Sequence, residues 1–235
     1  MTVRLAALSI DAHDPERLAD FWGAFLGRER TAYDDGVPTL APVQEPWLEL
    51  RFPQATAAKT ARNLMHLEVV GQRGETQEQV VERALSLGAV HTDVGQLPEE
   101  DHVVLADPEG NEFCVIESTT RWLAGCGFEG SLACDGTYDV GQFWSAALDW
   151  PLVHDEGEET GIQHLEGGTK IAWGGPPLME RPRKDWLHFD LAASDVEAEL
   201  DRLVGLGAMT VSGTACRHGV AMLDVDGNAF CLFAD

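Results

Sequence analysis

The chain reads Asp107-Pro108-Glu109-Gly110-Asn111-Glu112-Phe113-Cys114 near its middle, and 117 residues later it reads Asp224-Val225-Asp226-Gly227-Asn228-Ala229-Phe230-Cys231. Three further landmarks recur in the same order at nearly the same spacing: Phe21-Trp22 with Phe143-Trp144, His66-Leu67-Glu68 with His188-Phe189-Asp190, and Leu87-Gly88-Ala89 with Leu206-Gly207-Ala208. Self-similarity at a fixed period indicates a duplicated structural unit. The sequence therefore predicts two similar domains, residues 1–118 and 127–235, joined by a linker at 119–126.

Each half divides again into two units that begin with a strand and a helix. Alternation predicts a strand at 3–10, and the helix after it has Asp14 as N-cap, Pro15 at its first position and Gly27 at its end. Strands at 64–70, 130–134 and 186–191 open three more units, and the last helix is expected to start at Ser194 with Glu197 completing a capping box. The pattern predicts an α+β fold of four βαβββ units.

Composition narrows the function classes. The 235 residues are 44% hydrophobic, and none of their apolar runs approaches the roughly 20 residues that a membrane helix needs. The start of the chain lacks the pattern of a signal peptide, so we expect a cytoplasmic protein without a membrane partner. A net charge of −24 would repel nucleic acid. The same charge either keeps the protein soluble or concentrates a cationic small molecule.

The five cysteines include no C-x-x-C pair and are odd in number. The sequence therefore predicts neither a disulfide framework nor a zinc ribbon, and we expect reduced thiols.

These motifs together resemble one known superfamily. Phe-Trp early in a helix, His-x-Asp/Glu on a strand, Leu-Gly-Ala after a helix and Asp-Pro-x-Gly-Asn-x-Phe at the last hairpin are similar to the vicinal oxygen chelate proteins, which include glyoxalase I, bleomycin-resistance proteins and extradiol dioxygenases. The chain looks most like two tandem glyoxalase-like domains. The resemblance implies that paired βαβββ units curl their strands into cups that hold a ligand or a metal. It implies no particular reaction, because one fold hosts many chemistries.

The resemblance also implies where a metal would be held. In metal-using members, His or Glu side chains on the first, fourth, fifth and eighth strands of a domain bind a divalent ion. The matching positions are Ala7, Glu49, His66 and Cys114 in the first half and Glu129, Ile171, His188 and Cys231 in the second. Each half thus keeps one Glu, one His and one Cys, and exchange of units between the halves would still leave one of each per cup.

Two interpretations of these residues are open. They form an incomplete cage in which a thiolate favours zinc or iron, or the histidines are hydrogen-bonded in the cup and the cysteines pack as small apolar residues. We expect no cofactor, with a divalent ion (Zn, Ni, Fe or Mn) as the alternative.

The two His-x-Asp/Glu motifs are the predicted ligand-binding pairs. His66 with Glu68, and His188 with Asp190, project from one face of a strand and present an imidazole beside a carboxylate. Trp47 and Trp173 either stack on the ligand or pack at the rim. We expect metal-independent binding or sequestration of a small, cationic or aromatic molecule by a monomer, an intrachain pseudo-dimer, or by a homodimer. The alternative is a divalent-metal-dependent lyase, isomerase or dioxygenase of the glyoxalase type.

Overall fold

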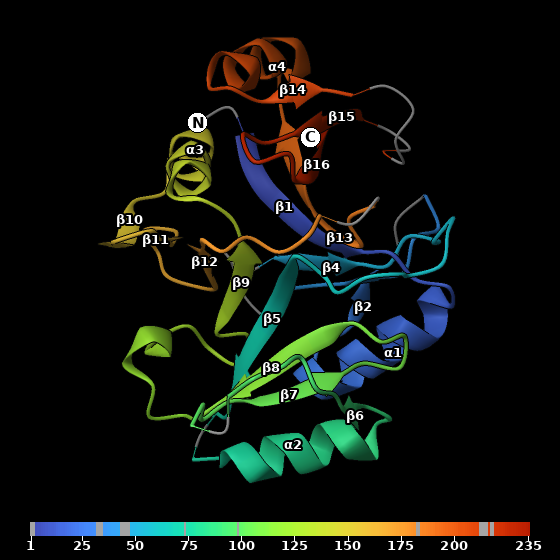
Figure 1. The fold of residues 1–235 in the computed structure, drawn as a ribbon. Helices are drawn as coiled ribbons and strands as arrows, with labels where there is room; N and C mark the ends of the chain where they lie inside the picture. The colour runs from blue at the N-terminus through green and yellow to red at the C-terminus, as the bar shows by residue number, and fades with distance from the viewer. Residues whose placement is uncertain are drawn as a thin grey trace.

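The computed structural model describes residues 3–31, 35–42, 48–72, 74–97, 99–181, 184–211, 216 and 219–235. These residues form two eight-stranded mixed sheets and four α-helices (Figure 1). Within this part of the chain, every helix is too short or too polar to cross a membrane. The predicted α+β architecture of four βαβββ units is therefore confirmed.

The first half contains the first two units. Unit 1 consists of β1 (Val3–Ile10), α1 (Pro15–Leu26), β2 (Arg30–Thr31), β3 (Thr39–Leu40) and β4 (Glu49–Arg51). Unit 2 consists of β5 (Met65–Val70), α2 (Gln77–Ser86), β6 (Val90–His91), β7 (Val103–Ala106) and β8 (Glu112–Ile116). The expected boundaries of α1 are confirmed, because the Asp14 side chain accepts a hydrogen bond from the Arg17 amide and Gly27 ends the helix at a φ of 68°.

The second half repeats this order after a short 3₁₀ helix, η1 (Arg121–Leu123), in the predicted linker. Unit 3 consists of β9 (Ser131–Asp135), α3 (Tyr138–Leu148), β10 (Leu152–Glu156), β11 (Glu159–Ile162) and β12 (Lys170–Gly174). Unit 4 consists of β13 (Leu187–Ala193), α4 (Val196–Gly205), β14 (Met209–Thr210), β15 (Val220–Leu223) and β16 (Ala229–Ala234). The expected cap of α4 is wrong by one residue: Asp195, not Ser194, accepts a hydrogen bond from the Ala198 amide.

Each sheet combines one unit from each half. The first sheet has the order β14-β15-β16-β13-β1-β4-β3-β2, and the second has the order β10-β11-β12-β9-β5-β8-β7-β6. The antiparallel pairs β1 with β13 and β5 with β9 join the units at the centre of each sheet. Unit 1 therefore shares a sheet with unit 4, and unit 2 shares a sheet with unit 3. The domain boundaries 1–118 and 127–235 mark the two sequence repeats and stay a prediction. They do not divide the chain into its two sheets, because each sheet takes strands from both repeats.

The repeated sequence landmarks bond to one another within each half. The indole Nε1 of Trp22 on α1 donates to the carboxylate of Asp107 at 3.1 Å, and that of Trp144 on α3 donates to Asp224 at 3.0 Å. Both aspartates also accept from the amide of the asparagine four residues later, at 2.9 Å in each case. The last hairpin of one unit is thereby fixed to the helix of the unit before it.

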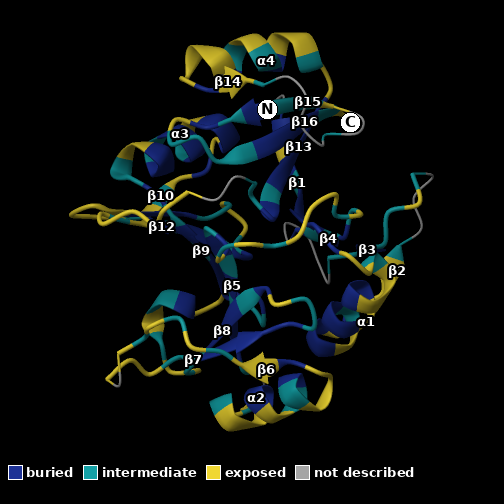
Figure 2. Cartoon of the chain, turned by 45° about the vertical axis from the view of Figure 1, so that its right-hand side comes forward, coloured by how far each residue is buried: buried dark blue, intermediate teal, exposed yellow. Residues whose placement is uncertain are grey.

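Aromatic packing surrounds each of these bonds. Trp22 and Trp144 are almost fully buried, as the helix periodicity predicts for core residues. Trp22 lies edge-on to Phe113 at a centroid distance of 5.2 Å, and Trp144 lies edge-on to Phe230 at 5.1 Å. Figure 2 shows the buried residues concentrated along the central strands and on the inward faces of α1 and α3. The core therefore links the helices to both sheets.

Replacing Trp22 by Phe keeps the aromatic packing but removes the donor to a buried carboxylate. We expect the free energy of unfolding to fall by about 1–3 kcal/mol, the cost of leaving a buried acceptor without one of its partners. Urea unfolding followed by circular dichroism measures it. Trp144→Phe removes the equivalent bond of the other half and should cost a similar amount. Wild-type stability in both variants would contradict this role of the repeated motif.

Candidate functional site

The first candidate site is a cavity of about 480 Å³ on the first sheet. We call it the disulfide cavity. The lining residues used below are Ser9, Arg51, His188, Asp190, Cys216 and Cys231. They come from β1, β4, β13, β16 and the segment before β15, so the cavity is built from units 1 and 4 together.

His188 and Asp190 form an ion pair in this cavity. His188 Nε2 lies 3.4 Å from Asp190 Oδ1, which is at the long limit of a hydrogen bond. The other oxygen, Oδ2, accepts a hydrogen bond from the Ser9 hydroxyl at 2.6 Å. Ser9 reaches it because β1 pairs with β13 in a register that places Ser9 opposite His188. The serine thus holds the carboxylate that faces the imidazole.

The environment of His188 favours the protonated ring. Burial opposes protonation, but the close approach of Asp190 and the charges of Asp190 and Asp11 outweigh it, so the pKa of His188 is raised above its ordinary value of 6.5. Lys184, which forms an ion pair with Asp11, reduces this increase. The cavity therefore pairs a carboxylate with an imidazole whose protonation it favours.

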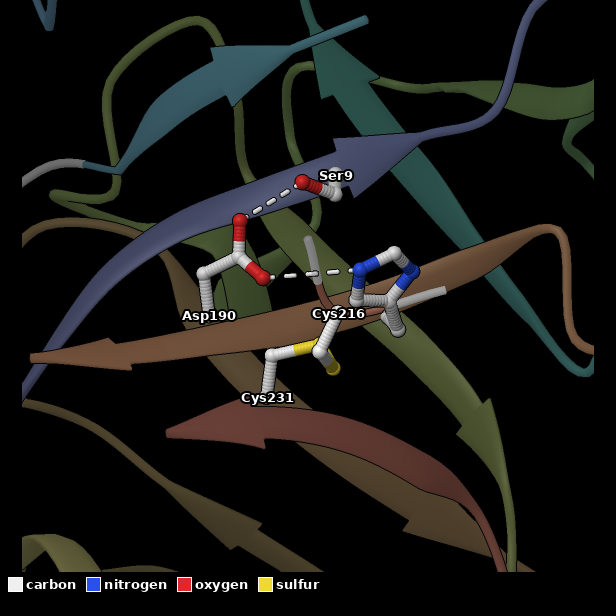
Figure 3. The surroundings of a disulfide bond; sticks show 5 residues. Ser9, Asp190, Cys216 and Cys231 are labelled. Atoms are coloured by element: carbon white, nitrogen blue, oxygen red, sulfur yellow. Dashed lines mark hydrogen bonds and ion pairs between the residues drawn. A yellow bond between two sulfur atoms is a disulfide. The ribbon is translucent and has the colours of Figure 1, made fainter. Parts of the chain in front are cut away.

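Cys231 forms a disulfide with Cys216, with a Cα–Cα distance of 5.9 Å (Figure 3). The expectation that all cysteines are reduced is therefore wrong for this pair. Cys216 has no motif to identify it, and its pairing depends on β15 and β16 bringing a segment 15 residues away in sequence beside the strand. Cys114, Cys126 and Cys134 are free and buried.

The second candidate site is a cavity of about 640 Å³ on the second sheet. We call it the acidic cavity. The lining residues used below are His66, Glu68, Trp122, Asp135, His154, Glu159 and Trp173. They come from units 2 and 3 and from η1. The described lining contains three carboxylates and neither Lys nor Arg.

The His66 and Glu68 pair repeats the geometry of the first cavity with a different outcome. Glu68 accepts a hydrogen bond from the Ser131 hydroxyl on β9, as Asp190 does from Ser9. Burial is the largest influence on His66 and lowers its pKa, and the charges of Glu68 and Glu112 compensate only in part. His66 is therefore neutral at pH 7, whereas His188 is drawn toward the charged form.

Other predicted site residues lie in different surroundings. Trp173 lines the acidic cavity but is only 2% exposed, so most of its indole packs in the core. Glu129 lies before β9 and is held by the guanidinium of the buried Arg28. Ile171 is fully buried, and its neighbour Ala172 lines the cavity instead. Trp47 lies outside the described residues.

Glu49 and Cys114 are also placed by the strand pairing. Glu49 pairs with Ala7 across β1 and β4, and Arg51, two residues later, lines the disulfide cavity. Cys114 pairs with Glu68 across β5 and β8. Burial, with the charge of Glu68 as a second cause, raises the pKa of the Cys114 thiol to about 12. This thiol is therefore protonated at neutral pH.

The residues present do not fit a divalent metal with the disulfide closed. Among the described residues, one group of three donor side chains has its ligand atoms within 4.8 Å of one another: His188, Asp190 and Cys231. The Cys231 sulfur is bonded to Cys216, so it is not the thiolate that binds metal. The two remaining donors are paired with each other. The acidic cavity is lined by His66 and Glu68, and Cys114 is not among its described lining residues.

Several site residues were not predicted from the sequence. Ser9 alternates onto the same face of β1 as Ala7, so its position in a cup was available from the strand pattern. Arg51 shares a face with Glu49 for the same reason. Trp122, His154 and Glu159 come from the linker and from the β10–β11 hairpin, where no periodicity marks them. Their place in the acidic cavity depends on tertiary structure.

Comparison with known proteins agrees with this fold. The glyoxalase-like domain family matches residues 7–116 and 131–233, whereas no curated protein matches the sequence. The structure resembles glyoxalase I from Zea mays (14% identity, 98% of this chain and 92% of that chain covered, TM-score 0.69). It also resembles a protein from Bacillus subtilis that is assigned as a dioxygenase (16% identity, 100% and 86% covered, TM-score 0.64). At such identities the likeness shows the fold alone. The chain belongs to the glyoxalase-like domain family, with two tandem copies in the vicinal oxygen chelate fold.

Proposed function

We propose that this protein binds a small cationic, aromatic molecule in the acidic cavity without the help of a metal. The observation that carries this proposal is the charge of the lining: Glu68, Asp135 and Glu159 face the cavity, and its described lining has no Lys or Arg. These carboxylates attract a cation that enters the cavity and repel an anion. The net charge of −24 for the whole chain acts in the same direction.

Aromatic side chains also line the acidic cavity. Trp122 is partly exposed at the cavity, with the His154 ring edge-on to it at 5.7 Å. The Trp122 ring already accepts one cation, since Lys170 Nζ lies 4.4 Å from its centroid. A planar or quaternary cation is the ligand class that such walls and carboxylates favour together.

The neutral His66 supports the same ligand class. An uncharged imidazole offers one donor and one acceptor without adding a positive charge that would repel a cation. Its carboxylate neighbour Glu68 is oriented by the Ser131 hydroxyl. The pair can therefore fix an amino or amide group at the floor of the cavity.

A metal-dependent lyase, isomerase or dioxygenase is the second candidate. The observation that favours it is the clustering of His188, Asp190 and Cys231 ligand atoms within 4.8 Å. It requires that the disulfide be open, because only a Cys231 thiolate completes the group. We place the binding function first because the acidic cavity needs no such change.

We further propose a monomer, because each eight-stranded sheet is completed within one chain by units from its two halves. Residence in the cytoplasm stays a sequence-based prediction.

Binding of charge-matched probes tests the proposed function. We expect benzyltrimethylammonium to bind and to change tryptophan fluorescence, while the anion phenylacetate does not bind. Glu68→Gln should weaken the cation about fivefold, the effect of losing roughly 1 kcal/mol of charge interaction. Glu158→Gln, an exposed carboxylate in the turn before β11 that does not line the cavity, is the matched control and should leave the affinity unchanged. Equal binding of the two probes would contradict the proposal.

Metal content separates the two candidate functions. Protein purified without chelator, with its disulfide verified by thiol counting, should contain far less than one zinc, nickel, iron or manganese ion per chain. The reason is that the closed disulfide leaves only two mutually paired donors. Elemental analysis by mass spectrometry measures the content. One tightly bound ion per chain that is lost in His188→Ala would favour the metal-dependent enzyme instead.

A further inference from the structure

We propose that the Cys216–Cys231 disulfide is a thiol–disulfide exchange centre that reacts with a low-molecular-weight thiol in the disulfide cavity. The disulfide cavity lies on the first sheet and the proposed ligand site lies on the second, so this proposal does not rest on the proposed binding function. Both sulfur-bearing residues line the cavity of about 480 Å³, so a small thiol has room to reach them.

The two sulfurs differ in accessibility. Cys231 lies in the central part of β16 and is 4% exposed, whereas Cys216 precedes β15 and is partly exposed. An incoming thiolate must approach along the S–S axis from the side of the sulfur that it attacks. The geometry therefore makes Cys216 the attacked sulfur and Cys231 the leaving sulfur.

His188 stands beside the leaving sulfur. Its ring nitrogen and the Cys231 sulfur lie within 4.8 Å of each other, and Asp190 holds the ring through the 3.4 Å ion pair (Figure 3 shows Asp190, Ser9 and the disulfide). An imidazolium next to a developing thiolate stabilises it, which speeds its departure. The charged groups that face His188 are Asp190, Asp11, Lys184 and, in the same lining, Asp35 paired with Arg51.

The small thiol is the only reactant that has to enter the cavity from outside. A thiolate forms a bond to Cys216 Sγ, the S–S bond breaks, and Cys231 leaves with the electron pair as a thiolate beside the protonated His188. A second thiolate attacks the external sulfur of the mixed disulfide and releases Cys216 as a thiolate. Two thiols are thereby oxidised to one small-molecule disulfide, and the two protons that they lost on forming thiolates complete the dithiol of Cys216 and Cys231. A small-molecule disulfide reverses the sequence.

Trapping of the mixed disulfide tests the direction of attack. Wild-type protein is mixed with 2-mercaptoethanol under native conditions, quenched in acid, alkylated with a maleimide that reacts at low pH, and mapped by mass spectrometry. We expect the thiol adduct on Cys216 and the alkyl group on Cys231. An adduct on Cys231, or no reaction until denaturant is added, would overturn the proposal.

Two variants test the part played by His188. His188→Gln should slow reduction at least tenfold at neutral pH, while His91→Gln, an exposed imidazole on the other sheet, should leave the rate unchanged. In a Cys216→Ala background, adding His188→Gln should slow alkylation of the free Cys231 by iodoacetamide at neutral pH at least tenfold, whereas adding His91→Gln should leave that rate unchanged. An unchanged alkylation rate in the His188→Gln variant would show that His188 has only a structural role, and would defeat the proposal even if reduction slowed.

Discussion

The antiparallel pairing of β1 with β13 and of β5 with β9 is the interaction on which the rest of this structure depends. These pairs join strands from different halves of the chain at the centre of each sheet. They also bring a serine from one half beside the carboxylate of the other, Ser9 with Asp190 and Ser131 with Glu68. Without this pairing neither cavity would have its floor, because each floor takes residues from both halves.

A second set of bonds ties units together within each half. The Trp22–Asp107 and Trp144–Asp224 hydrogen bonds fix the last hairpin of one unit to the helix of its sequence neighbour. The hairpin carboxylate Glu109 also accepts from the amides of His13 and Asp14 at the start of α1, and Asp226 does the same for Thr137 before α3. Sheets therefore connect the halves while hairpins and helices connect the units inside them, so no unit is independent of the others.

The sequence predicts the features of this fold that depend on interactions between residues close together in the chain. Four units, the cap at Asp14, the stop at Gly27 and the buried Trp22 and Trp144 follow from periodicity and capping alone. Which units share a sheet does not follow, because either pairing offers each cup the same residue types. The position of Ile171 shows a further limit, since a one-residue error in register turns a side chain from the cavity into the core. Trp122 and Cys216 reach their cavities only through tertiary structure.

Duplication has produced two cavities with the same His-x-Asp/Glu floor, in which the pKa of the histidine is shifted in opposite directions. In one, an ion pair with Asp190 outweighs the burial of His188, and in the other burial dominates for His66. This divergence agrees with the assignment of cation binding to the cavity without Lys or Arg and of thiol chemistry to the cavity with the disulfide.

A titration of the two imidazole rings by nitrogen-15 NMR tests this divergence most directly, with His66→Gln and His188→Gln spectra to assign the signals. We expect His188 to titrate above the ordinary value of 6.5 and His66 below it. Coincident titrations, or the reverse order, would contradict it.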